Sequence, residues 1–294
     1  MTAYESSPGH YGTLSIILPA KNEEGAVGAT VSGIRSSFPD AQIIVVNDGS
    51  TDQTAELAQT AGAEVVSHPY SKGNGAAIKT GARHATGDII VFMDADGQHD
   101  PADIPRFLAQ MAKGYDMVVG ARQAGSQASV GRGLANGFYN RLASWMTGQK
   151  IEDLTSGFRA VRADKFRQFL YLLPNGFSYP TTSTMAFFRA GYGVAYIPIM
   201  AAKRIGKSHI HLLRDGVRFL LIIFKIGTLY SPLKLFLPVA FLHFVVGAGY
   251  YLFTYIEFSR LSLASVFLWS AAVTIFLIGL VSEQITQLMY KDQD

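Results

Sequence analysis

The stretch that decides the fold runs Ile89-Ile90-Val91-Phe92-Met93-Asp94-Ala95-Asp96-Gly97-Gln98. Its first half is a continuous apolar run, which is typical of a strand buried on both faces of a sheet. Two acidic residues, Asp94 and Asp96, follow where the strand ends. In open α/β sheets, ligands bind beyond the carboxyl ends of the parallel strands. The stretch therefore predicts a buried strand that carries a pair of carboxylates to a ligand site.

Further short strands lie on both sides of this stretch and alternate with helical segments. The sequence predicts strands at residues 14–18, 42–46, 65–66, 88–93 and 116–119. It predicts helices at residues 24–37, from about 51 to 61, 75–85 and after Pro101, with Ser50 or Thr51 as the cap of the second. This alternation indicates an α/β domain with a mostly parallel sheet and helices on both faces.

Polar clusters also follow the first two strands. Asn22 and Glu23 come after the first, and the cluster Asn47-Asp48-Gly49-Ser50-Thr51-Asp52 comes after the second. The carboxyl ends of parallel strands meet at one edge, so we expect these side chains to surround one crevice with Asp94 and Asp96. Carboxylates in the second cluster are suited to a ribose or a base; the alternative is a capped turn between strand and helix.

The pair Asp94 and Asp96 is suited to a divalent cation. Carboxylate oxygens bind Mg²⁺ or Mn²⁺, and the diphosphate of a nucleotide sugar supplies further oxygen ligands. Gln98 is placed to add a ligand or to orient one. The alternative is that these aspartates, with Asp100, only form turns and a helix cap.

A glycine-rich segment, Lys72-Gly73-Asn74-Gly75-Ala76-Ala77-Ile78, opens the next predicted helix. It does not complete a dinucleotide-binding fingerprint, because Ile78 stands where the third small residue belongs. A dehydrogenase is therefore disfavoured.

Composition narrows the function classes further. The 294-residue chain has no cysteine, which excludes thiolate catalysis and Cys-ligated metals and suits a reducing compartment. Its formal net charge is +3, too small to indicate a nucleic-acid partner. The first apolar run, residues 14–20, is short and is followed at once by charged residues, so we expect no secretory signal.

The C-terminal part differs from the rest, because residues 233–288 are almost continuously apolar. Two segments, 235–256 and 261–281, each have about the 20 residues that an apolar helix needs to cross a bilayer. Before them, polar and apolar residues from His211 to Lys225 alternate at helical spacing, which favours a helix in the membrane interface. The expected organisation is a flexible arm (1–12), an α/β domain (13–208), an amphipathic helix (209–230) and two transmembrane helices (233–257 and 261–289).

Charges flanking the spans predict the orientation of this hairpin. The connection between the spans is short, so both outer ends lie on the same side of the membrane. That side carries most of the Lys and Arg residues and is expected to be cytosolic: Lys203, Arg204, Lys207, Arg214, Arg218, Lys225, Lys234 and Lys291, against Arg260 in the connection. We therefore expect an integral protein of the cytoplasmic membrane, or of the endoplasmic reticulum in a eukaryote, with its α/β domain in the cytosol.

In this order and spacing, the clusters resemble the family-2 glycosyltransferases of the GT-A fold over residues 12–210. The segment Asp153-Leu154-Thr155-Ser156-Gly157-Phe158-Arg159 resembles a signature of the branch that contains dolichol-phosphate mannosyltransferases and other polyprenyl-phosphate glycosyltransferases. The resemblance implies a GT-A domain with a Rossmann-like mixed sheet, a nucleotide-sugar donor, a polyprenyl phosphate acceptor and Mg²⁺ or Mn²⁺.

The resemblance also implies roles for individual residues. Those expected around the nucleotide sugar are Pro19, Ala20, Asn22, Glu23, Asn47, Asp48, Lys72, Gly73, Asp94, Ala95 and Asp96. Those expected at the metal are Asp94, Asp96 and Gln98. Those expected at the acceptor phosphate are Arg122, Arg132, Asn136, Ser156, Arg204 and His209. Asp96, Asp153, Arg122 and Arg132 are the expected catalytic group.

Several positions depart from the family pattern. Asn47 stands where the family usually has Asp, and Asn136, His209 and Thr184 stand where Ser, Lys and Glu are frequent. These departures bear on the nucleoside contact and on the preference for acceptor or sugar. The Gln-x-x-Arg-Trp motif of processive polysaccharide synthases is absent around Trp145 and Trp269, and two spans are too few for a polymer channel.

The expected reaction is an inverting displacement in which an oxygen of the carrier phosphate attacks the anomeric carbon of a hexose-type sugar. A phosphate monoester has a second pKa of about 6 and needs no strong base near neutral pH. A lipid hydroxyl acceptor such as diacylglycerol would need one, for example Asp153. Asp153 could instead orient the sugar or pair with Arg159 in its own turn. A nucleotidyltransferase and a non-catalytic membrane scaffold are the rival classes, and a homo-oligomer is compatible with the sequence.

Overall fold

The computed structural model describes residues 12–123, 130–176, 178–200, 224 and 227–291, and within these stretches it describes all side chains except those of residues 130–136 and 289–291. The chain divides into two units. The first contains the α/β domain, and the second contains two long C-terminal helices.

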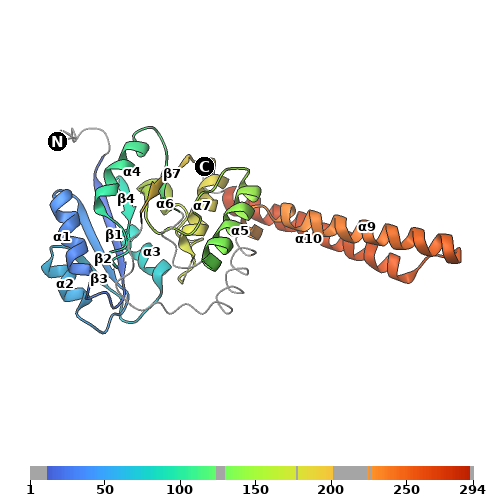
Figure 1. Cartoon of the computed structure of the whole chain (residues 1–294), viewed down its shortest axis with the longest axis horizontal. Coiled ribbons are helices and arrows are strands. Elements are labelled where there is room, and N and C mark those ends of the chain that lie inside the picture. Colours follow the sequence, from blue (N-terminus) through green and yellow to red (C-terminus); the bar gives the residue numbers. More distant parts are fainter. Residues whose placement is uncertain (1–11, 124–129, 177, 201–223, 225–226, 292–294) are drawn as a thin grey trace. The chain divides into compact units, whose positions relative to one another are not determined.

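A seven-stranded sheet forms the centre of the α/β domain (Figure 1). Its strands lie in the order β3-β2-β1-β4-β6-β5-β7. All neighbouring pairs are parallel except those of β6, which runs antiparallel to both β4 and β5. The strands are β1 (Leu14–Ala20), β2 (Gln42–Asn47), β3 (Glu64–Ser67), β4 (Ile89–Phe92), β5 (Met117–Arg122), β6 (Arg159–Arg162) and β7 (Val194–Ile199).

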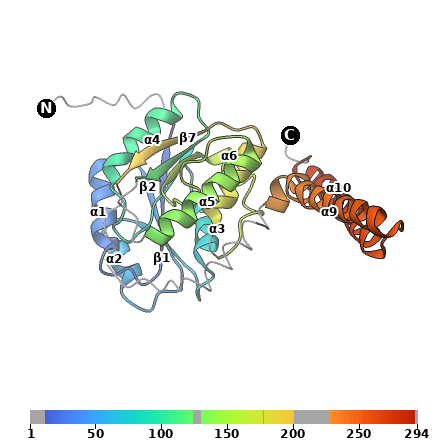
Figure 2. The same ribbon diagram turned by 45° about the vertical axis from the view of Figure 1, so that its right-hand side comes forward.

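Helices cover both faces of this sheet (Figures 1 and 2). Helices α1, α2 and α4 pack on one face, and α3, α6 and α7 pack on the other. The helices of the domain are α1 (Val27–Ser37), α2 (Thr54–Thr60), α3 (Asn74–His84), the 3₁₀ turn η1 (Pro101–Asp103), α4 (Ile104–Met111), α5 (Val130–Thr147), α6 (Ala163–Arg167) and α7 (Tyr179–Arg189).

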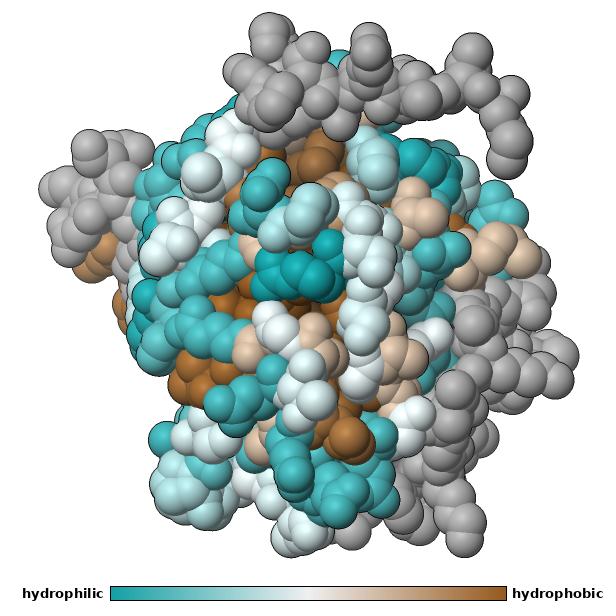
Figure 3. Space-filling model, turned by 90° about the vertical axis from the view of Figure 1, so that its left-hand side faces the viewer, coloured by the Kyte–Doolittle hydropathy of each residue, from teal (hydrophilic) through white to brown (hydrophobic). Residues whose placement is uncertain are grey.

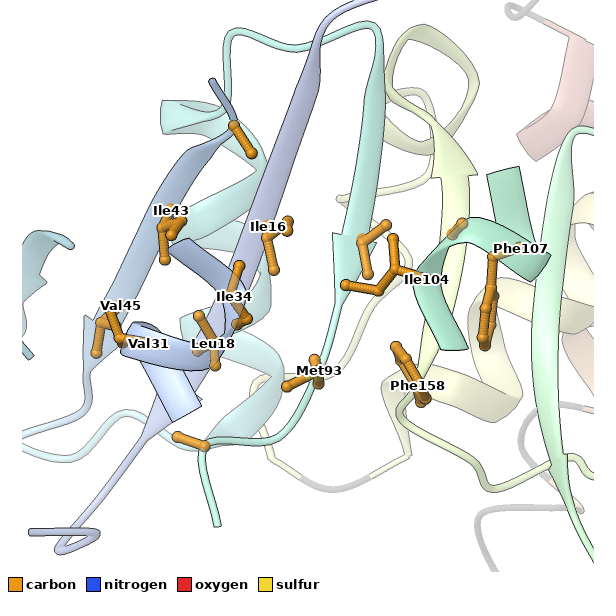
Figure 4. Close-up of a cluster of buried hydrophobic side chains, with 14 of the residues drawn as sticks. Ile16, Leu18, Val31, Ile34, Ile43, Val45, Met93, Ile104, Phe107 and Phe158 are labelled. Carbon is orange, nitrogen blue, oxygen red and sulfur yellow. The ribbon is translucent and has the colours of Figure 1, made fainter. Parts of the chain in front are cut away.

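The core on the first face follows from the alternation of side chains along the strands. Ile16 and Leu18 of β1 and Ile43 of β2 point to the same face, where they meet Val31 and Ile34 of α1 (Figure 4). All five side chains are essentially inaccessible to solvent. Burial of a side chain of this size contributes about 1.5–3 kcal/mol relative to exposure, so this layer fixes the strands whose ends form the site.

A close contact between α3 and β1 stabilises the second face. A Cβ atom on Gly81 would lie 2.4 Å from Cγ2 of Ile17. Only glycine allows the helix backbone to approach the strand this closely. The position of α3 matters for function, because its N-terminal residues line the cavity described below.

The predicted fold class is confirmed, with differences in detail. Helix α1 begins at Val27 rather than at residue 24. Neither Ser50 nor Thr51 caps α2; the Asp52 carboxylate accepts a hydrogen bond from Thr54 N instead. Neither β6 nor β7 was predicted; β6 lies between β4 and β5 and makes the sheet mixed.

The second unit contains the helices α9 (Pro232–Phe258) and α10 (Leu263–Lys291). Residues 232–258 and 263–288 are long and apolar enough to cross a membrane. Along both helices large apolar side chains are exposed, such as Phe241, Leu242 and Phe267. The face of the α/β domain in Figure 3 is instead covered mainly by hydrophilic residues. Exposed apolar surface of this extent is typical of contact with lipid.

The two C-terminal helices pack on each other through a small residue. A Cβ on Gly247 would lie 2.9 Å from Cδ1 of Trp269, and the indole Nε1 donates a hydrogen bond to Phe244 O at 3.3 Å. Small residues at such interfaces let helices approach closely in lipid. The structure has α10 beginning at Leu263 and continuing to Lys291. Most of the amphipathic helix expected at residues 209–230 lies outside the described residues.

Candidate active site

A cavity of about 520 Å³ opens at the carboxyl ends of β1, β2 and β4. Its lining comes from six separate regions of the chain. They are Pro19, Ala20, Lys21 and Glu23; Asp48; Ser71, Gly73, Asn74 and Ala77; Asp94, Ala95, Asp96 and Gln98; Thr155 and Gly157; and Ser178, Tyr179 and Pro180. The crevice expected from the strand ends is therefore present.

Asp94 presents an open carboxylate to this cavity. It is the second residue after β4, and its side chain is 37% exposed. Among the described residues, none donates a hydrogen bond to the Asp94 carboxylate, and His99 Nδ1 lies 4.0 Å from Oδ2. A Cβ on Gly157 would lie 3.2 Å from the same Oδ2 atom. Glycine at this position leaves room for the carboxylate.

Asp96 is more buried than Asp94, with 6% of its surface exposed. Its Oδ1 accepts a hydrogen bond from Gln98 N at 3.1 Å, which shapes the turn after the strand. Asp94, Asp96 and Gln98 line the same cavity. The three residues predicted at the metal are therefore brought together.

Asp48 lies at the end of β2, and its carboxylate is fully used inside the protein. Oδ1 receives His68 Nδ1 and Lys72 N, both at 2.8 Å. Oδ2 receives Ser71 Oγ at 2.7 Å and Gly73 N at 2.9 Å. Burial by itself raises the pKa of Asp48, but these hydrogen bonds outweigh it and hold the pKa below its usual value. Asp48 therefore shapes the loop of residues 71–73 beside the cavity.

Asn22 joins the loops that follow β1 and β2. Its Oδ1 accepts a hydrogen bond from Thr51 N at 2.9 Å, and its own N–H donates to Ser50 Oγ at 3.0 Å. Its φ of 55° is in the left-handed region, which Asn tolerates better than most residues. The side chain thus holds a turn together, and the lining of the cavity does not include it.

The residues predicted around the nucleotide sugar therefore separate into two groups. The larger group lines the cavity: Pro19, Ala20, Glu23, Asp48, Gly73, Asp94, Ala95 and Asp96. Asn22, Asn47 and Lys72 are not among the lining residues. Asn47 bonds to Ser67 Oγ and Ser50 N, and Lys72 reaches Asp48 through its backbone.

Arg122 and Asp153 form a largely buried ion pair. Arg122 Nε lies 2.8 Å from Oδ2 of Asp153, and Nη2 lies 3.0 Å from Oδ1. The two side chains are 28% and 8% exposed. Such a paired arrangement with two parallel hydrogen bonds fixes both groups in orientation as well as in charge. The alternative pairing of Asp153 with Arg159 is wrong.

The Asp153 carboxylate has further donors. The backbone amides of Thr155 and Ser156 donate to Oδ1 at 3.0 and 3.1 Å. Burial by itself raises the pKa of Asp153, but the hydrogen bonds and charge of Arg122 outweigh it, and the pKa lies below its usual value. A carboxylate with a lowered pKa and with its lone pairs in use is a poor general base.

Arg159 is fully buried on β6 and connects two walls of the cavity. It donates to Ser156 O in the loop after Asp153. It also donates to Pro180 O at 2.9 Å and to Ser183 Oγ at 2.8 Å in α7. The sequence did not predict this role, since its partners are distant in the chain and follow no short motif. The lining residues that were also missed are Lys21, Ser71, Asn74, Ala77, Thr155, Gly157, Ser178, Tyr179 and Pro180.

Four of the residues predicted at the acceptor phosphate remain predictions. The backbone of Arg132 and Asn136 belongs to α5, but their side chains are not described. Arg204 and His209 lie outside the described residues. Ser156 is buried, its Oγ has no hydrogen-bond partner in the described part of the chain, and the cavity lining does not include it.

The donor set at Asp94, Asp96 and Gln98 fits a small divalent cation that shares ligands with a phosphate. The described residues contain no group of three or more His, Cys, Asp or Glu side chains placed to enclose a metal. Mg²⁺ is commonly held by one or two carboxylates together with substrate phosphates, not by an all-protein cage. The open Asp94 carboxylate is consistent with that mode.

Comparisons with known proteins agree with this geometry. The sequence profile of glycosyl transferase family 2 matches residues 15–170, and that of the GtrB C-terminal hairpin matches residues 231–288. The chain is 29% identical over 249 residues to glycosyltransferase AglJ of Haloferax volcanii, which covers 82% of this chain and 81% of that protein. It is 30% identical over 211 residues to an undecaprenyl-phosphate mannosyltransferase of Micrococcus luteus, covering 65% and 85%.

Solved structures support the fold assignment. Glucosyl-3-phosphoglycerate synthase of Mycobacterium tuberculosis, solved with Mn²⁺, uridine diphosphate and phosphoglyceric acid, superimposes with a TM-score of 0.61. It is 22% identical and covers 74% of this chain and 78% of its own. From the matched profiles and the cavity at the strand ends together, we conclude that the chain belongs to glycosyl transferase family 2 and carries a C-terminal hairpin of the GtrB type.

Proposed function

We propose that the protein transfers a hexose-type sugar from a UDP- or GDP-linked donor to a polyprenyl phosphate, with a divalent cation, at the cytosolic face of a membrane. Its relatives include the undecaprenyl-phosphate mannosyltransferase of Micrococcus luteus and a dolichyl-phosphate hexose transferase of Haloferax volcanii, 27% identical over 208 residues. These names support a lipid phosphate as the class of acceptor.

The observation that carries the proposal is the contrast between Asp94, which lines the cavity, and Asp153, which precedes the lining residues Thr155 and Gly157 but is not part of the lining. Asp94 accepts no hydrogen bond from the described residues, whereas Asp153 accepts several. A carboxylate that accepts no hydrogen bond is available to bind a cation. A carboxylate whose lone pairs are all used in hydrogen bonds is a poor acceptor of a proton from a substrate. The site is thus equipped to hold a metal diphosphate but has no free base at Asp153.

This contrast favours a phosphate acceptor over a lipid hydroxyl. A hydroxyl must lose its proton as it attacks, so it needs a general base. A phosphate monoester, with its second pKa of about 6, is already largely dianionic near neutral pH. Asp153 in the ion pair with Arg122 suits the second case, where positioning and charge balance replace proton abstraction.

In this proposal the chain's residues have distinct tasks. Asp94, Asp96 and Gln98 hold Mg²⁺ or Mn²⁺, which when bound offsets the negative charge that develops on the leaving diphosphate. Asp48 holds the loop of residues 71–73 at the edge of the cavity, where the nucleotide sugar is expected to bind. Asp153 fixes the guanidinium of Arg122, which remains a predicted contact of the acceptor phosphate. Arg132 and Arg204 remain predicted contacts of the acceptor phosphate.

The membrane brings the acceptor to the enzyme. The apolar helices α9 and α10 and the match to a GtrB-type hairpin support anchoring in a bilayer. Lys and Arg residues flank the outer ends of the two spans, which supports a cytosolic location for the α/β domain. A carrier confined to the same membrane reaches the site at a high local concentration.

The test is a product assay with matched acceptors. The full-length protein in detergent is incubated with Mg²⁺ or Mn²⁺ and a panel of UDP- and GDP-sugars. Each donor is combined with undecaprenyl phosphate, with undecaprenol and with diacylglycerol, and the lipid products are identified by mass. Asp96→Ala is the inactive control.

We expect a glycosylated product from the lipid phosphate alone, absent with Asp96→Ala. A product from undecaprenol or diacylglycerol, but not from the phosphate, would establish a hydroxyl acceptor. No product with any combination, from a protein that remains folded, would favour the scaffold interpretation.

A further inference from the structure

His99 is a buried polar side chain whose Nδ1 atom makes no hydrogen bond within the described residues. It follows the predicted metal ligand Gln98 in the turn after β4, and its side chain is 5% exposed. A buried nitrogen without a partner costs free energy, on the order of 1–3 kcal/mol. Such a group indicates either a packing compromise or a contact that forms only in another state of the site.

Aromatic packing fixes the position of the His99 ring. It stacks on Phe158 with the ring centroids 4.9 Å apart, and Phe158 in turn packs on Phe107 at 4.5 Å. Figure 4 shows Phe107 and Phe158 next to each other in the core. Both phenylalanines are fully buried. The imidazole is therefore held in place, and its Nδ1 atom cannot move far to find a partner.

The group that faces His99 Nδ1 is the Asp94 carboxylate. The distance to Oδ2 is 4.0 Å, about 1 Å longer than a hydrogen bond between nitrogen and oxygen. Asp94 is 37% exposed, so its side chain is the partner that is free to rotate. A Cβ on Gly157 would lie 3.2 Å from the same Oδ2 atom, so the glycine leaves the carboxylate room to rotate. A small rotation toward His99 would close the gap.

We propose that His99 is a positioning residue for the metal site: its Nδ1–H donates a hydrogen bond to Asp94 Oδ2 when the cation is bound. The carboxylate is thereby fixed with its other oxygen available to the cation. Groups behind a metal ligand commonly act in this way, and their loss weakens metal binding by about 10- to 100-fold. The inference rests on the proposed function, because it requires a cation at Asp94 and Asp96.

The experiment measures cation binding directly. Free Mn²⁺ is followed by its electron paramagnetic resonance signal as the full-length protein is added, in the presence of UDP and, in parallel, GDP. His99→Phe keeps an aromatic ring against Phe158 and removes the donor. His99→Asn loses the ring but places an amide donor near the position of Nδ1. His84→Phe, an exposed position on α3, is the matched control.

We expect His99→Phe to bind Mn²⁺ at least about tenfold more weakly than the wild type, and His99→Asn to stay within about threefold of it. A role in packing alone predicts the reverse order, since the ring would then matter and the donor would not. The inference would be overturned if His99→Asn bound Mn²⁺ more weakly than His99→Phe. It would also be overturned if both variants were weakened equally, or if His99→Phe bound Mn²⁺ as the wild type does.

Asp96→Ala separates this inference from the proposed function. Loss of Mn²⁺ binding in Asp96→Ala with unchanged binding in His99→Phe contradicts the role of His99 alone. Unchanged Mn²⁺ binding in Asp96→Ala contradicts the metal site itself.

Discussion

Two acidic side chains that follow β2 and β4, the strands on either side of β1, have opposite environments. Asp48 after β2 accepts four hydrogen bonds within the domain, from His68, Ser71, Lys72 N and Gly73 N. Asp94 after β4 accepts none from the described residues. Both line the same cavity. The first carboxylate uses its charge to shape a loop, and the second keeps its charge available for a ligand.

The comparison teaches that position at a strand end does not by itself assign a role. The fold topology places acidic residues around the crevice. The number of hydrogen bonds that each carboxylate accepts from the protein then distinguishes a structural carboxylate from one that is available to a ligand. Asp153 belongs with Asp48, because its lone pairs also point to protein donors. Four substitutions test this distinction.

The largest effect is expected at the open carboxylate. Asp94→Asn removes the charge that attracts the cation and keeps the size of the side chain. We expect transfer of sugar to the lipid to fall by at least about 10³-fold, since several kcal/mol of charge stabilisation are lost. The thermal denaturation midpoint should be unchanged, because no internal hydrogen bond to this carboxylate is lost. Activity retained within tenfold would contradict the assignment.

The next effect concerns stability. Asp153→Asn leaves Arg122 with a neutral partner in a largely buried position. Breaking a buried pair in this way costs about 3–5 kcal/mol, and the 28% exposure of Arg122 places the expected loss near the lower end. Chemical denaturation of the full chain in detergent measures it. A variant as stable as the wild type would show that the pair contributes little.

The pH dependence of stability follows from the same pair. The pKa of Asp153 in the folded chain is lower than its unfolded value of about 3.9. The stabilisation is therefore complete above the unfolded value and is lost as the pH falls through the folded one. We expect the stability of the wild type to fall more steeply below about pH 4 than that of Asp153→Asn. Parallel curves for the two proteins would contradict the lowered pKa.

A smaller effect is expected from crowding the open carboxylate. Gly157→Ala places a Cβ 3.2 Å from Asp94 Oδ2, closer than a relaxed contact. The side chain must shift, and we expect Mn²⁺ affinity to fall by about three- to tenfold, less than for loss of the whole ligand. Titration of Mn²⁺ measures this, and Gly137→Ala on the exposed part of α5 is the control. Equal affinities in both variants would show that Asp94 has room to move.

The smallest effect is expected from a change to one of the donors of Asp48. His68→Phe removes one of the four donors to Asp48 and leaves the contacts of Ser71, Lys72 N and Gly73 N. The loss of one net hydrogen bond is worth about 1 kcal/mol. We expect the KM for the nucleotide sugar to rise by about fivefold, with kcat nearly unchanged, because the loop loosens but the metal ligands stay. A fall in kcat with constant KM would place His68 closer to the chemistry.

The sequence was sufficient to predict five of the seven strands and the position of Asp94, Asp96 and Gln98 at one cavity, because both depend on local pattern. The apolar run before Asp94 and the alternation of strands and helices gave the crevice and its acidic edge. The pair Arg122 and Asp153 depends instead on two segments 31 residues apart. It forms because β6 inserts between β4 and β5, and no periodicity in the sequence indicates an antiparallel strand there.

The sequence also could not predict which carboxylates accept hydrogen bonds inside the domain. Asp48 and Asp94 occur in similar contexts, each after a buried strand and before a glycine-containing turn. Whether donors surround the carboxylate depends on loops that fold back, such as residues 71–73 against Asp48. Asn22 shows the same limit, since its side chain binds the neighbouring loop at Thr51 and does not line the cavity.

The most direct test of the central claim is the Mn²⁺ dependence of the initial rate of lipid-phosphate-sugar formation, compared between the wild type, Asp94→Asn and Asp48→Asn. We predict a saturable dependence in the wild type, no measurable rate at any Mn²⁺ concentration in Asp94→Asn, and a reduced rate with the wild-type half-saturation in Asp48→Asn. A metal-independent wild-type rate, or a half-saturation that shifts in Asp48→Asn but not in Asp94→Asn, would contradict the account.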